Sequence, residues 1–190
     1  MSRFIIIFIT VLTTIATFAS AYADPLTPAK IEKFVSSVEE LRKHESDFPK
    51  TTATIASGRT MDSLSKMIDS DGNFILYQSM VKNLSSYPEE ATQLRGIIKK
   101  AGFKDEHEWA KTGDAVVLAY GSTQLSAKDR KEMSDGLAQI TPEMMAMMPA
   151  ETQAMMKSAM AASKAMASVP PEDVEAIKPF IARLEAANKG

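Results

Sequence analysis

The sequence contains no cysteine and only two histidines in 190 residues. Without cysteine, the chain can form no disulfide, no thiolate zinc site and no cysteine nucleophile, and it offers no lipobox cysteine for lipid attachment. Its formal net charge of −2 lacks the basic excess that a general nucleic-acid-binding protein needs. We therefore expect no nucleic-acid partner, and we expect the stability of the chain to depend on packing.

Motifs that would indicate catalysis are also missing. The sequence has no glycine-rich phosphate loop and no Gly-x-Ser-x-Gly elbow. Paired carboxylates such as Glu39–Glu40 and Glu89–Glu90 are typical of solvated faces, or of helix starts where the helix dipole favours acidic groups. Asp114 lies at the edge of an apolar helix face, where we expect a half-buried, hydrogen-bonded structural role. The sequence thus leaves an enzyme uncertain, favours a non-enzymatic protein, keeps a hydrolase as the third alternative and predicts no cofactor.

The longest apolar run of the chain lies at its N-terminus. Arg3 precedes the nearly uninterrupted apolar segment 4–12, and further small residues lead to Ala21 and Ala23. A positive start, an apolar stretch too short to span a bilayer and small side chains at the last and third-last positions are typical of a secretory signal peptide. We therefore predict a signal peptide over residues 1–23, with an uncleaved anchor as the alternative. The expected location is periplasmic or secreted, with no membrane span after cleavage.

The rest of the sequence shows helical periodicity. Apolar residues recur every three or four positions in successive segments, and each segment is bounded by proline, glycine or a capping residue. No segment shows a convincing alternation of apolar and polar residues, which would be typical of a strand. We therefore predict an all-α fold in which residues 24–190 form a single-domain bundle of about seven or eight short helices.

Individual residues predict several helix boundaries. An N-cap residue accepts a hydrogen bond from the first turn of its helix, and a glycine past the last turn can end one. The residues that fit these roles are Thr27, Asp105, Ser126 and Thr141 as N-caps, and Gly102 as a C-terminal cap.

Other boundaries are predicted from periodicity. Apolar residues from Met61 to Ile68 predict a second helix, and Phe74 marks the start of a third. Gly121 is expected to end the helix that follows Asp105. Gly113 lies inside that same helix, where glycine costs about 1 kcal/mol relative to alanine. It therefore predicts the close approach of a neighbouring helix.

Methionine is concentrated in one part of the chain. Eight of the 13 methionines lie between positions 144 and 166, within a Met/Ala-rich segment over 141–168. At about 100° per residue, the last four fall on one broad helix face, and Lys157 and Lys164 fall on the other. The four methionines on this face are Met155, Met156, Met160 and Met166.

Three interpretations of this segment remain open. Methionine can be an adaptable filler between closely packed helices, so the face can be core. It can also form a binding surface, because unbranched, polarisable side chains repack against varied apolar partners. On this second interpretation the protein is an exported, non-enzymatic binding protein that engages a hydrophobic ligand or a protein partner. The residues that we expect to make this contact are Met144, Met148, Met155, Met156 and Met160.

The third interpretation is a soft-metal site. Thioether sulfur favours Cu(I) and Ag(I), and because it is neutral it cannot be blocked by protonation. Methionines three or four residues apart on a helix could offer two sulfurs to one ion. The alternative function is therefore a periplasmic Cu(I)/Ag(I)-binding protein. The candidate ligands are Met144, Met147, Met148, Met156 and Met160.

Two weaker metal patterns have simpler explanations. Residues 69–74 resemble the middle of a calcium loop, but Met67 and Gln78 occupy the positions of its first and last ligands. A turn between two helices explains these residues better. His44 and His107 lie near predicted helix ends, and no spacing joins them to a metal-ligand motif.

Overall fold

The computed structural model describes residues 25–48, 67–69 and 73–188, and helices dominate these ranges. The prediction of an all-α fold is confirmed: the described ranges contain no β-strand, and an isolated bridge joins Ile68 to Phe74. None of the helices in them combines the length and the apolar character that crossing a bilayer requires. The predicted signal peptide over 1–23 lies outside the described residues.

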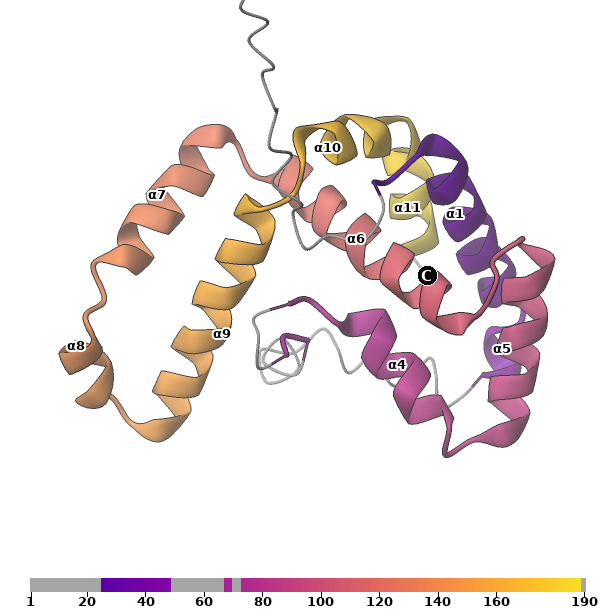
Figure 1. Cartoon of the computed structure of the whole chain (residues 1–190), viewed down its shortest axis with the longest axis horizontal. Helices are drawn as coiled ribbons and strands as arrows, with labels where there is room; N and C mark the ends of the chain where they lie inside the picture. The colour runs from indigo at the N-terminus through magenta and orange to yellow at the C-terminus, as the bar shows by residue number, and fades with distance from the viewer. Residues whose placement is uncertain (1–24, 49–66, 70–72, 189–190) are drawn as a thin grey trace, which may run out of the picture.

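Helix α6 runs through the middle of the helical body (Figure 1). It contacts α1, α4, α5, α9 and α10, and α11 packs against α1. Around α6 (Glu106–Gln124) the body contains α1 (Pro28–Lys43), the 3₁₀ turn η1 (Glu45–Asp47), α4 (Leu76–Leu84), α5 (Pro88–Lys100), α10 (Pro171–Ile177), the 3₁₀ turn η2 (Lys178–Phe180) and α11 (Ile181–Asn188).

Three helices form an arm beside this body, on the left of Figure 1. They are α7 (Ala127–Ala138), the short α8 (Pro142–Ala146) and α9 (Ala150–Ala167). Helices α7 and α9 lie side by side, and α9 also contacts α6. The main cluster of buried apolar side chains contains no residue of the arm. The core therefore belongs to the body, and the arm extends from it.

The predicted helix caps are confirmed. Each N-cap side chain accepts a hydrogen bond from the backbone N–H three residues later, over distances between 2.8 and 3.3 Å. Gly102 has a φ of 87°, and the N–H of the following Phe103 donates to the carbonyl of Ile98 over 3.2 Å. Gly102 therefore has a left-handed backbone conformation and ends α5 as a glycine C-cap. The four N-caps are Thr27, Asp105, Ser126 and Thr141.

The predicted end of α6 at Gly121 is wrong. The helix continues to Gln124, and Gly121 does not have the positive φ of a glycine cap. The extra turn is held by tertiary contact, because the buried Ser122 donates a hydrogen bond to the carbonyl of Met166 in α9 over 3.3 Å. Packing against the arm therefore extends α6 beyond the point that its local sequence indicates.

The end of the second predicted helix is not helical, and the rest of it lies outside the described residues. Ile68 instead forms the bridge with Phe74. Between them, the carboxylate of Asp69 accepts hydrogen bonds from the backbone and side-chain nitrogens of Asn73 over 2.8 and 3.0 Å. Because these contacts hold a turn, α4 begins at Leu76 and not at Phe74.

The close approach predicted at Gly113 is present. A Cβ atom at this position would lie 2.6 Å from Cε2 of Phe34 in α1 and 2.8 Å from the ring of Tyr77 in α4. These two rings meet edge to face with centroids 5.1 Å apart, and the Trp109 ring lies 5.7 and 5.2 Å from them. The indole N–H of Trp109 donates to the hydroxyl of Ser37 over 2.7 Å. Three helices thus meet at one glycine.

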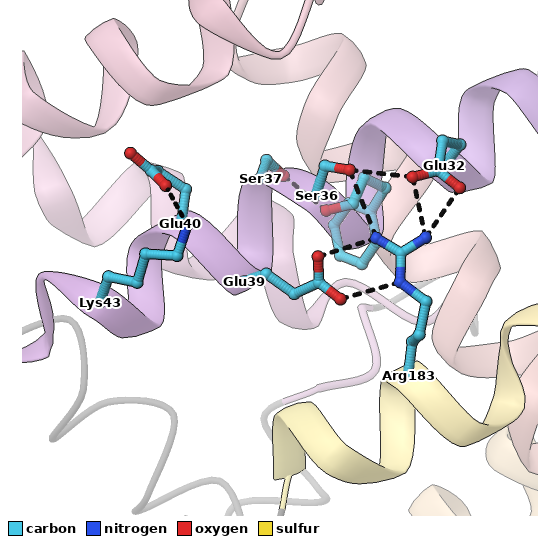
Figure 2. A network of polar contacts seen from close by, with 8 residues as sticks. Glu32, Ser36, Ser37, Glu39, Glu40, Lys43 and Arg183 are labelled. Atoms are coloured by element: carbon cyan, nitrogen blue, oxygen red, sulfur yellow. Dashed lines mark hydrogen bonds and ion pairs between the residues drawn. The ribbon is translucent and has the colours of Figure 1, made fainter.

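The C-terminal helix α11 is joined to α1 by a network of polar contacts centred on Arg183. Figure 2 shows Arg183 of α11 between two carboxylates of α1. Its nitrogens lie 2.8 Å from both oxygens of Glu32 and from both oxygens of Glu39. Hydrogen bonds from Arg183 lower the pKa of Glu39. All three side chains keep solvent contact, so we expect this network to orient α11 more than to stabilise the fold.

The packing at Gly113 yields a test with a control in the same helix. Gly113→Ala gains about 1 kcal/mol of helix propensity, but overpacking against two rings costs about 1–3 kcal/mol or more. Because Phe34 is buried and both rings are held by Trp109, we expect a net loss in the free energy of unfolding. Gly121→Ala meets no atom within 4 Å and should be neutral or stabilising. Urea denaturation distinguishes the two, and a G113A variant as stable as G121A would contradict the packing described.

Candidate partner-binding site

The arm begins with a helix whose exposed face carries paired charges. Ser126 and Asp129 form a capping box at the start of α7. Lys128 and Glu132 lie 3.6 Å apart, and the ammonium of Lys131 lies 2.6 Å from Asp135. These neighbours one turn apart neutralise each other. The outer surface of α7 is therefore solvated and shows no excess of either charge.

Helix α8 is a short element at the end of the arm. Thr141 caps it through the N–H of Met144, and Pro142 takes its first position. Met144 of this helix is 50% exposed, and its C-cap residue Met147 is 87% exposed. The side-chain amide of Gln153 in α9 donates to the carbonyl of Met148 over 3.0 Å, which ties α8 to α9.

Helix α9 carries the second half of the methionine-rich segment. Met155 is 47% exposed, whereas Met156 and Met160 are half-buried. Lys157 and Lys164, predicted on the opposite face, are exposed. Ser163 and Ala165 are buried. The helix therefore seats Ser163 and Ala165 against the chain, leaves Met155 exposed, and keeps Met156 and Met160 partly covered.

All the predicted site residues lie on α8, α9 or their connection, and none of them is buried. Large apolar side chains with high exposure are few in the described ranges: Tyr87, and the three methionines Met144, Met147 and Met155. Exposed apolar area is therefore concentrated on the arm. We use the name methionine face for the predicted site residues Met144, Met147, Met148, Met155, Met156 and Met160 taken together.

The segment that carries the methionine face has balanced charge. Between positions 141 and 168 the sequence holds two glutamates and two lysines. The pairs of opposite charge on α7 add nothing to either sign. A surface of this kind attracts an anionic membrane or a nucleic acid only weakly, because binding to either one requires an excess of basic residues on the protein. An uncharged apolar partner suits it best.

Asp114 makes the hydrogen bonds of the structural role expected for it, but it is buried and not half-buried. Its carboxylate is 4% exposed and accepts hydrogen bonds from the backbone N–H groups of Tyr77 (2.7 Å) and Gln78 (3.4 Å), and from the Gln78 side-chain amide (2.9 Å). These N–H groups belong to the first turn of α4, whose own N-cap residue makes no side-chain hydrogen bond. Asp114 thus caps α4 from a neighbouring helix. Burial raises the pKa of Asp114 to about 6.

The two histidines lie apart from this site. His44, at the C-terminal end of α1, has Nδ1 at 3.2 Å from Asp47 and Nε2 at 3.8 Å from Glu40. His107 lies in the first turn of α6. Across the residues that the structure describes, no group of three or more histidines and carboxylates has an arrangement that could hold a metal ion. Residues 70–72 of the calcium-loop pattern lie outside the described ranges.

Sequence reasoning missed the interhelical contacts made by Arg183 and by the capping carboxylate of α4. Neither has a local signal, because the partners are far away in the sequence. No family model, no curated protein and no solved structure gives a significant match to this chain. The described residues form an all-α protein with a helical arm.

The raised pKa of Asp114 predicts a pH dependence of stability. Its pKa is about 6 in the fold and near 3.8 once exposed by unfolding, so between these values the folded state binds more protons. The contribution of Asp114 to stability therefore falls as the pH rises from about 4 to about 6, by up to about 3 kcal/mol. Asp114→Asn abolishes this titration. Urea denaturation at about pH 4 and pH 7 should show wild type losing stability relative to D114N.

Asp129 provides a control of opposite sign. Hydrogen bonds from Ser126 lower the pKa of its carboxyl, so its contribution is present at neutral pH and is lost on acidification. Asp129→Asn should therefore lower the free energy of unfolding most at neutral pH. An equal difference between wild type and D114N at both pH values would contradict the assignment of Asp114.

Proposed function

We propose that the protein is an exported, non-enzymatic binding protein whose methionine face engages an apolar helical segment of a protein partner. In this proposal residues 1–23 direct export, and residues 24–190 act as one helical domain in the periplasm or outside the cell. The observation that carries the proposal is the concentration of exposed methionine on α8 and α9, outside the core of the body.

The chemistry of methionine supports a peptide ligand. Its side chain is unbranched and polarisable, so a row of methionines can adapt to apolar side chains of different shapes. The alanines between them on α9 let another helix approach closely. The balanced charge of segment 141–168 favours contact through apolar area over contact through ion pairs.

A trio of substitutions separates apolar contact from other roles of methionine. The glutamine variant combines Met144→Gln, Met147→Gln and Met155→Gln. It keeps the length of each side chain and removes its apolar area. The corresponding leucine variant keeps the apolar area and loses the sulfur. We expect the chain to bind a fluorescent, uncharged amphipathic peptide of leucine and glutamine, the glutamine variant to bind at least about tenfold more weakly, and the leucine variant to retain affinity. Fluorescence anisotropy measures all three.

Controls for this experiment come from α7. Lys128→Gln combined with Lys131→Gln alters the arm without touching the methionine face, so peptide binding should be unchanged. Circular dichroism establishes that each variant remains helical. The proposal fails if the wild-type chain shows no saturable binding, or if the glutamine variant and wild type bind the peptide equally.

A soft-metal site is the second candidate, favoured by one observation. Met144 and Met147 are three residues apart and both are exposed, so their sulfurs are accessible to an ion from solvent. If the methionine face holds Cu(I), the leucine variant should lose at least about tenfold in affinity, because leucine offers no donor atom. Anaerobic competition with a chromophoric Cu(I) chelator measures this. A chain that cannot compete with the chelator, or a leucine variant that competes as well as wild type, excludes this role.

A further inference from the structure

A cavity of about 450 Å³ lies in the body between α4, α5 and the first turn of α6. Pockets for small organic ligands usually measure about 300–1,000 Å³, so this volume is sufficient for one. The cavity is separate from the methionine face, since no residue of the arm lines it. A ligand held there would therefore be a second, independent binding partner.

The floor of the cavity is apolar. Leu84 of α4 forms it together with Ala91 and Leu94 of α5, and these side chains belong to the buried core, which holds the floor in place. Val81 of α4 is half-buried and offers further apolar surface above this floor. An apolar floor of this kind favours a short hydrocarbon group.

The rim of the cavity carries an excess of positive charge in a chain whose net charge is −2. Arg95 and Glu106 pair over 2.9 Å and neutralise each other. Lys82 has no hydrogen bond or ion pair from its ammonium group to any part of the described chain. The hydroxyl of Ser85, which follows α4 and also lines the cavity, donates to the Lys82 carbonyl over 2.7 Å and keeps its oxygen able to accept a hydrogen bond. The rim thus offers one uncompensated cation.

We propose that this cavity binds a small amphipathic carboxylate, with its hydrocarbon group against Val81, Leu84 and Leu94 and its carboxylate at Lys82. A single negative charge matches the Lys82 ammonium, which has no partner among the described residues, whereas a dianionic phosphate would leave charge unmatched beside Glu106. Arg95 lies on the opposite helix, where its guanidinium can offer a further N–H without leaving Glu106.

Sodium octanoate below its micelle concentration is the probe for this site. We expect saturable chemical-shift changes in the amide NMR spectrum of the chain at residues that line the cavity. Octanol lacks the charge and octylammonium inverts it, so both should bind at least about tenfold more weakly than octanoate.

Lys82→Gln keeps the length of the side chain and removes its charge, so octanoate affinity should fall by about tenfold or more. Lys99→Gln, on the exposed surface of α5 outside the cavity, is the matched control and should bind octanoate as wild type does. Thermal unfolding establishes that K82Q is folded. Equal affinity in K82Q and K99Q would overturn the proposal, as would shifts confined to the arm.

The glutamine variant of Met144, Met147 and Met155 separates this inference from the proposed function. It removes apolar area on the arm and touches no residue of the cavity. Octanoate binding should therefore be unchanged in it, while binding of the amphipathic peptide is lost. Loss of both activities in this variant would overturn the assignment of octanoate to the cavity and leave the arm as the site for both probes.

Discussion

The packing of the body depends on Gly113, the position at which α6 carries no side chain. At Gly113 the helix surface is flat enough for Phe34 and Tyr77 to reach its backbone from two other helices. Aromatic rings bury much apolar area and meet favourably edge to face, which is the geometry seen here. Because Trp109 completes the cluster and is tied to α1 by its indole N–H, this one crossing sets the positions of α1, α4 and α6.

Asp114, the residue after Gly113, adds an electrostatic interaction to the same contact between α6 and α4. The first N–H groups of a helix have no partner within it and carry partial positive charge. In α4 they find the carboxylate of Asp114, brought within reach by the close packing at Gly113. Steric fit and capping thus reinforce each other at consecutive positions. The wall of α4 that faces α5 is positioned by this contact, and with it the cavity between the two helices.

The arm is built on a different principle. Helices α7 and α8 have side-chain N-caps and α7 has internal ion pairs, but the arm contributes no side chain to the main core. Contact between α6 and α9 and the hydrogen bond from Ser122 join it to the body. Apolar side chains are usually buried where a fold has interior positions for them. On the arm, Met144, Met147 and Met155 stay exposed among the described residues, and we therefore propose that the methionine face contacts another molecule.

The sequence by itself determined those features that depend on neighbours within about one helical turn: the helical class, the four N-caps and the glycine cap at Gly102. These contacts join residues three to five positions apart, so local residue types suffice to predict them. Tertiary structure supplied the cap of α4, which comes from Asp114, 37 positions beyond Tyr77. It also decided that the methionine face lies outside the core. A helix face that is buried within its own chain and a helix face that stays exposed can have the same apolar periodicity. The sequence pattern therefore cannot distinguish them, and only the tertiary packing does.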